Sequence, residues 1–113
     1  MPTAEQRIKA LGLVLPQPVK PPPGVVLPFQ FVRVQGSRAF VSGHGPTNAD
    51  GSLAGPLGKV GRELDVAQGA AAARLVGLAV LGSLQRALGD LDRIVAWTRV
   101  FGMVNSAPGF NLQ

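Results

Sequence analysis

The chain has 113 residues, the size of one domain, and 46% of them are hydrophobic, which is enough for one core. It has no cysteine, which excludes disulfides and thiolate chemistry, and its single histidine and six carboxylates lack metal-binding spacing. The formal charge of +5 comes from scattered lysines and arginines with no basic run, which is more typical of a solvated surface than of a nucleic-acid interface.

The N-terminal segment is predicted to be a short helix followed by an extended strap. Thr3 and Gln6 form a capping-box pattern and Gly12 is a natural stop, which indicates a helix from Ala4 to Leu11. The proline-rich stretch Leu15–Pro28 favours extended geometry because prolines remove backbone donors and fix φ. A recognition motif for proline-binding domains is the alternative interpretation of this stretch.

Two β-type runs follow, Phe29–Val34 and Arg38–Ser42, separated by Gln35–Ser37. A glycine in a three-residue connection between such runs predicts a hairpin. The second run passes into Ser42-Gly43, and a polar, glycine-rich loop, Thr47–Gly61, comes next.

The strongest helical pattern covers Val66–Leu88, with a capping box at Asp65 and Gln68 before it and Gly89 after it. This helix is apolar on nearly all sides, so we expect it to be covered on more than one side. Gly77 and Gly82 cost helix propensity, and close packing against a neighbour would justify them.

The last predicted element is a strand, Ile94–Val104, whose Ile, Val, Trp and Phe do not alternate cleanly with polar residues. That pattern is typical of a strand buried on both faces or at an interface. The element order therefore predicts a single α+β domain, residues 1–113, in which residues 1–28 form the helix and strap and residues 29–113 form the core.

The sequence also favours a cytoplasmic protein without a membrane partner. The first residues are polar and charged where a secretory signal would be apolar. The longest apolar stretch, between Arg74 and Gln85, is well short of the ~20 residues that span a bilayer.

The chain's only histidine, His44, lies in the turn "FVSGHGP". Gly43-His44-Gly45 begins like a dinucleotide fingerprint, but Asn48 occupies the third glycine position. Ser42 and His44 could face the same way, but no nearby acid is placed to orient the imidazole as a hydrolase requires.

Four stretches in this order, "RAFVSGHGP", "DGSLAGPLGKVG", the capped helix and "VFGMVNSAPGF", resemble the RidA/YjgF family, also named endoribonuclease L-PSP, in its subgroup with an extended N-terminus. The resemblance covers essentially the whole chain. It implies a chorismate-mutase-like α+β fold and homotrimers with ligand clefts between subunits. It also implies hydrolysis of small 2-imino or enamine acids to 2-keto acids and ammonia, without a cofactor or a metal.

The same resemblance assigns the candidate site. Ser42 and Gly43 match the pair that lines the family's cleft, and His44 stands where relatives commonly have glutamine. The aromatic residue that closes the cleft corresponds to Phe29 or Phe31, with Phe29 taken as the candidate. The implied ligand is a small carboxylic acid.

One departure from the family bears on activity. In relatives the chain continues with a second helix and two strands, which carry a carboxylate-binding arginine and an acidic residue that positions water. This sequence stops at Gln113, so no catalytic residue is assigned and deaminase activity is expected to be weak. A non-catalytic trimer that binds small metabolites and an endoribonuclease or RNA-binding protein are the alternative functions.

Overall fold

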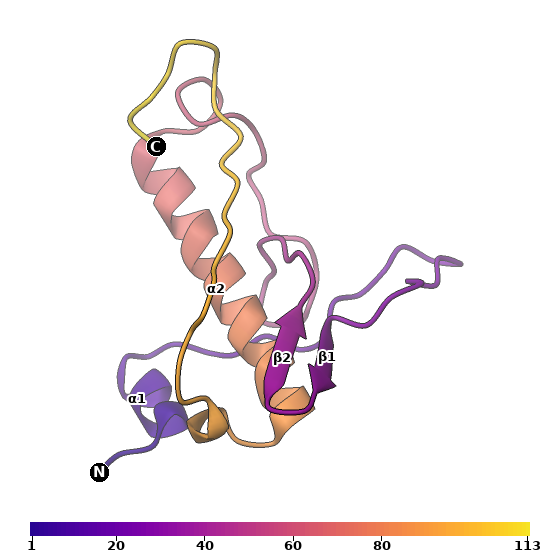
Figure 1. Cartoon of the computed structure of the whole chain (residues 1–113). Helices are drawn as coiled ribbons and strands as arrows, with labels where there is room; N and C mark the ends of the chain where they lie inside the picture. Colours follow the sequence, from indigo (N-terminus) through magenta and orange to yellow (C-terminus); the bar gives the residue numbers. More distant parts are fainter.

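The computed structural model describes all 113 residues (Figure 1). In chain order it contains α1 (Ala4–Ala10), β1 (Val32–Gln35), β2 (Arg38–Val41), α2 (Val66–Leu88) and the 3-10 turn η1 (Leu91–Arg93). The protein is therefore an α+β structure, as predicted from the sequence.

The first helix is the capped helix that the sequence predicts. Thr3 Oγ1 accepts from the Gln6 backbone N–H at 3.1 Å, and Gln6 Oε1 accepts from the Thr3 N–H at 2.8 Å. Leu11 is the C-cap and Gly12 follows with φ of 72°, which is the left-handed region that favours glycine.

The hairpin forms with a shorter connection and shorter strands than predicted. Gln35 pairs with Arg38, so the connection is the two residues Gly36 and Ser37, and β1 begins at Val32 rather than at position 29. The reason is that β2 ends at Val41: the Ser42 N–H still donates to Phe31 O, but residues 29–30 have no strand opposite them.

The strap lies against the loop that follows the hairpin. Gln17 N–H donates to Ala49 O at 2.8 Å and Lys20 N–H donates to Gly51 O at 3.1 Å. Gly51 has φ of 88°, and a Cβ there would lie 2.1 Å from Pro18 O, so only glycine fits. The proline-rich residues beyond Lys20 form a loop that projects from the body of the molecule (Figure 1).

The long helix α2 has the predicted bounds and caps. Asp65 and Gln68 form both hydrogen bonds of the capping box, and Gly89 ends the helix in a left-handed conformation. Of the two interior glycines, Gly82 packs closely, because a Cβ there would lie 3.2 Å from Pro16 O. Nothing lies within 4 Å of a Cβ at Gly77, so close packing does not explain that glycine.

The expectation that α2 is covered on more than one side is wrong for this chain. Its buried residues are confined to the stretch 78–84, and the N-terminal half is largely exposed. By length and composition α2 would also suit a membrane-spanning helix, with 22% of the relevant window buried. The absence of a membrane partner stays a prediction.

The predicted strand Ile94–Val104 is wrong as secondary structure in this chain. Residues 95–104 make no backbone hydrogen bond, and Figure 1 shows the segment as extended chain without a strand. Its far end is fixed by bonds from Val60 N–H to Asn105 O and from Ala107 N–H to Val60 O, both 2.9 Å. Strand composition needs a neighbouring strand to form a ladder, and none lies beside this segment.

The core is small for the size of the chain. Twelve of the 113 residues are buried, mainly in α2 and in the loop around Ala54, Val60 and Leu64. The accessible surface is 8324 Å², whereas a compact monomer of this mass exposes about 5,900 Å². The radius of gyration is 15.3 Å, against about 13 Å for a compact domain of this length. Much apolar surface therefore stays exposed.

Candidate ligand-binding turn

The candidate site is the turn Ser42–Pro46, which begins where β2 ends. Ser42 N–H donates to Phe31 O and Ser42 Oγ donates to Gln30 O, each at 2.9 Å. The serine hydroxyl proton is therefore used to tie the turn to the segment that precedes β1, while its oxygen lone pairs stay free to accept.

His44 links this turn to α2. Its Nδ1 lies 2.7 Å from Ser42 O, and its Nε2 lies 2.8 Å from Ser83 Oγ on α2. A carbonyl oxygen only accepts, whereas the Ser83 hydroxyl can donate or accept, so the two contacts suit an imidazole that carries a proton on Nδ1.

The same serine connects the turn to the strap. Arg86 Nη2 donates to Ser83 Oγ at 3.3 Å, and Arg86 Nη1 donates to Pro16 O at 3.0 Å. Pro16 and Ser83 are both buried. Three segments far apart in sequence, the strap, the turn and the C-terminal half of α2, are thus joined by one chain of hydrogen bonds.

Two aromatic rings follow the imidazole in series, the first tilted against it and the second edge-on to the first. The Phe31 ring centroid lies 4.9 Å from that of His44, and Phe29 packs edge-on against Phe31 at 5.1 Å. Of the two residues that the sequence left open, Phe31 is therefore the one that contacts His44. Phe29 is one ring further out and 47% exposed.

The backbone of the turn offers unused donors. The N–H groups of Gly43, His44 and Gly45 donate to no protein acceptor, and a Cβ built at either glycine would meet nothing within 4 Å. Amides without a protein acceptor are available to donate to water or to an oxygen of a ligand. The turn is thus a wall with donors rather than an enclosed pocket.

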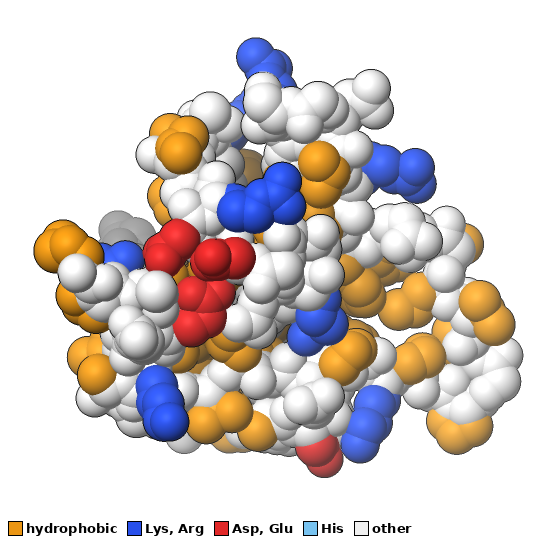
Figure 2. Space-filling view, turned by 90° about the horizontal axis from the view of Figure 1, so that it is seen from below, with side chains coloured by type: hydrophobic (Ala, Val, Ile, Leu, Met, Phe, Trp, Pro, Cys, Tyr) orange, Lys and Arg blue, Asp and Glu red, His pale blue; other side chains and the backbone are white.

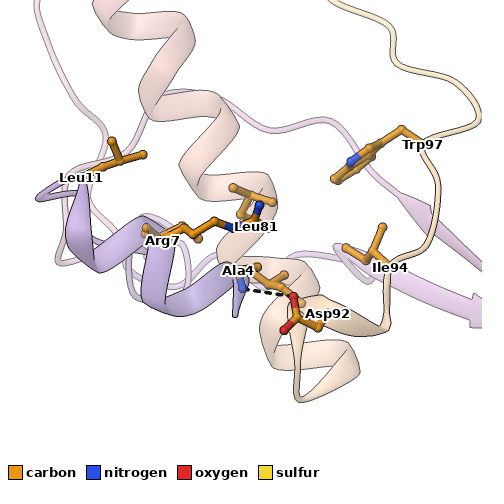
Figure 3. A pocket seen from close by; sticks show the side chains of 9 residues that line it. Ala4, Arg7, Leu11, Leu81, Asp92, Ile94 and Trp97 are labelled. Carbon is orange, nitrogen blue, oxygen red and sulfur yellow. Dashed lines mark hydrogen bonds between the residues drawn. The ribbon is translucent and has the colours of Figure 1, made fainter. Parts of the chain in front are cut away.

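A separate cavity of about 320 Å³ lies between α1, α2 and the chain that follows η1 (Figure 3). Its lining is mostly apolar and includes Leu81, Leu91 and Trp97, with Arg7 and Asp92 as the charged residues. None of the residues of the turn lines it, so the sequence-predicted site and this cavity are different places.

Three carboxylates gather beside this cavity, those of Glu5, Asp90 and Asp92, within 4.8 Å of one another; Figure 2 shows acidic side chains grouped on this face. Glu5 Oε1 accepts from the Leu91 N–H at 2.8 Å, and Asp92 Oδ1 accepts from the Ala4 N–H at 3.0 Å. The bond from Leu91 holds the pKa of Glu5 below its ordinary value. These carboxylates thus satisfy the free amides at the ends of α1 and η1.

The basic side chains do not form a patch on the face that Figure 2 shows, where lysines and arginines lie apart. Some are neutralised locally. Arg62 pairs with its neighbour Glu63, which raises the pKa of Arg62 and lowers that of Glu63, and Lys20 lies 3.9 Å from Asp50. The geometry of the turn, and not the overall charge, distinguishes the candidate site.

Sequence reasoning placed Ser42, Gly43 and His44 in one turn, and the structure has them there. It missed Ser83, Arg86 and Pro16, which complete the hydrogen-bond chain. The one available signal was a serine inside an alanine- and leucine-rich helix, because a hydroxyl buried on such a helix needs a partner.

No family model matches the chain. The chain is similar to Protein TCP17 of Trypanosoma cruzi, with 37% identity over 106 residues that cover 94% of this chain and 62% of TCP17. It is also similar to the crystal structure of a "putative endoribonuclease" from Shewanella oneidensis, with a TM-score of 0.68 and 34% identity over 81% of this chain and 57% of that one. The chain thus spans about 60% of the length of these relatives.

The likeness to the Shewanella structure covers fold and sequence together, over 81% of this chain. It supports the resemblance of this chain to the RidA/YjgF family, also named endoribonuclease L-PSP.

Proposed function

We propose that the chain is the core of a protein that hydrolyses small 2-imino or enamine acids to 2-keto acids and ammonia, with the turn Ser42–Pro46 as one wall of the ligand cleft. The observation that carries this proposal is the set of three N–H groups at Gly43, His44 and Gly45 that donate to no protein acceptor, with open space beside the two glycines. The resemblance to the RidA/YjgF family supports it.

The chemistry asks little of the protein. Water adds to the electrophilic carbon of the protonated imine, the resulting carbinolamine loses ammonia, and the carbonyl of the keto acid forms. The amides of the turn would hold an oxygen of the substrate in place, and holding the substrate in register lowers the entropic part of the barrier. No cofactor enters this reaction.

We propose that the protein acts as a homotrimer in the cytoplasm and that neighbouring copies supply the opposite wall of the cleft. The exposed apolar side chains of residues 95–104, with Val95 96% exposed and Phe101 76% exposed, support association. The surface in excess of a compact monomer is on the order of 2,400 Å², and stable interfaces between obligate partners bury areas of this size.

The test combines binding and turnover on the 113-residue chain. Pyruvate, a product-class probe, is titrated into ¹⁵N-labelled protein, and the amide signals of residues 43–45 are expected to shift, while those of Gly36 in the hairpin turn serve as the control. In parallel, an amino-acid oxidase generates 2-imino acids, and keto-acid release is compared with and without the chain. We expect a small acceleration, because no arginine is assigned to the substrate carboxylate.

The outcomes separate the candidates. Shifts at the turn with acceleration support imine hydrolysis, and shifts without any acceleration support the alternative of a non-catalytic protein that binds small carboxylic acids. No shift at tens of millimolar pyruvate and no acceleration would contradict the proposed function.

RNA cleavage or binding is the second candidate, favoured by the name of the Shewanella relative and by the charge of +5. The chain's cations are scattered, so we expect weak binding of single-stranded RNA that disappears at about physiological ionic strength, where the Debye length is ~8 Å. Titration of labelled RNA at two salt concentrations tests this. Tight binding that survives the higher salt and weakens on Arg33→Ala or Arg99→Ala would favour the RNA function.

A further inference from the structure

We propose that the hydrogen-bond chain from the strap through α2 fixes His44 as the Nδ1–H tautomer, which makes Ser83 and Arg86 positioning residues for the turn. A role of this hydrogen-bond network in ligand binding rests on the proposed function, but the tautomer of His44 does not. Neither residue lies in the turn that the family's motif marks.

The direction of each hydrogen bond follows from whether its groups can donate or accept. Arg86 only donates, and the carbonyls of Pro16 and Ser42 only accept. The Ser42 carbonyl accepts from Nδ1–H at 2.7 Å, so Nε2 of the neutral imidazole accepts from the Ser83 hydroxyl at 2.8 Å, while Arg86 Nη2 donates to a lone pair of the same oxygen.

The consequence for the turn comes from the planarity of the peptide bond. Ser42 C=O and Gly43 N–H belong to one trans peptide unit, so they point in opposite directions. Because His44 Nδ1–H holds the Ser42 carbonyl, it also aims the Gly43 N–H away from the imidazole, and that N–H has no protein acceptor. Both imidazole nitrogens thus form hydrogen bonds within the protein, and the bond from Nδ1 orients the Gly43 N–H.

The residues packed around these hydrogen bonds hold their donors and acceptors in place. Ser83 is 6% exposed, so its hydroxyl has little water to turn to. Gly82 lets the strap approach α2 closely, since a Cβ there would lie 3.2 Å from the Pro16 oxygen that Arg86 binds. The Phe31 ring packs against the imidazole in a tilted arrangement, with ring centroids 4.9 Å apart.

The chain's single histidine makes the test unambiguous. Histidine-selective ¹⁵N labelling gives one pair of ring signals, and the two-bond couplings identify which nitrogen carries the proton. For the unaltered chain at neutral pH we expect Nδ1 to be protonated, although the free imidazole prefers Nε2–H. A wild-type spectrum with the proton on Nε2 would overturn the proposal by itself.

Variants then test the role of Ser83. Ser83→Ala removes the donor to Nε2, and we expect the tautomer ratio to move about three- to tenfold toward Nε2–H, as the net value of one hydrogen bond predicts. The Gly43 amide signal should move with it. Ser83→Thr should retain the wild-type spectrum, and Ser37→Ala, in the hairpin turn, is the matched control.

The outcomes distinguish this proposal from the proposed function. An unchanged tautomer and an unchanged Gly43 amide in Ser83→Ala overturn the positioning role, whether or not pyruvate binds. A shifted tautomer supports the role even if pyruvate fails to bind, in which case only the proposed function falls. If Ser83→Ala does not fold, Arg86→Met is read in the same way, because it removes the donor that directs the serine hydroxyl.

Discussion

Two stretches of similar composition behave in opposite ways in this protein. Residues 78–84 of α2 are apolar and packed, with Leu84 2% exposed, and the strap, the turn and η1 gather around this half of the helix. Residues 95–104 are equally apolar, yet they make no backbone hydrogen bond and Val95 is 96% exposed.

The difference shows what a helix and a strand each need. A helix satisfies its backbone within itself, so α2 forms with its caps even where its surface is open. A strand needs a neighbour for every N–H and C=O group, and residues 95–104 find none in this chain. The first stretch is complete in one copy, and we propose that the second is completed by other copies.

Alanine substitutions at Leu84 and Val95 should affect the free energy of unfolding very differently. Leu84→Ala should lower the free energy of unfolding by about 2–5 kcal/mol, because it opens a cavity in the packed half of α2. Val95→Ala is the matched control in the exposed stretch. Urea unfolding of both variants at low protein concentration measures the difference, and a comparable loss for Val95→Ala would show that residues 95–104 are packed within the monomer.

The second prediction concerns the contact between the strap and the loop that follows the hairpin. Gly51→Ala should cost about 1–3 kcal/mol, because φ at Gly51 is 88° and the new Cβ would meet Pro18 O. Gly102→Ala, in the exposed stretch with nothing within 4 Å, is the control and should change stability little. Thermal unfolding compares them, and equal midpoints would mean that the strap does not hold this loop.

Alanine substitutions at the two interior glycines of α2 should change the stability in opposite directions. Gly77→Ala should stabilise the chain by about 0.5–1 kcal/mol, since alanine is the better helix former and space is open around it. Gly82→Ala should destabilise it, because the strap lies against that position. A loss of stability at Gly77, measured by urea unfolding, would place a neighbouring chain against this face.

The smallest expected effect concerns pH. The Leu91 N–H lowers the pKa of Glu5 in the folded state from its ordinary value of 4.5, so the ionised carboxylate contributes stability that is present above pH 4.5 and lost as pH falls through the lowered pKa. Glu5→Gln should flatten this part of the profile. Urea midpoints between pH 7 and pH 3 test it, and a slope in Glu5→Gln equal to wild type would assign the dependence to other carboxylates.

Local signals in the sequence predicted what local interactions decide. The capping boxes at Thr3 and Asp65 and the stop at Gly89 gave both helices to within one residue, because each depends on neighbours three or four positions away. The turn at Ser42 was found through its motif. The partners Ser83, Arg86 and Pro16 were not, because contacts across 39 and 70 positions leave no local pattern. The strand predicted at 94–104 was wrong for a related reason, because the local composition does not show whether a partner strand is present.

We propose that the apolar surface of α2 and of residues 95–104 is an interface between copies of this protein. Multi-angle light scattering of the purified chain over a range of concentrations tests it most directly. We predict a particle of three times the monomer mass of 11.7 kDa. A well-folded monomer that persists at high concentration would contradict the claim.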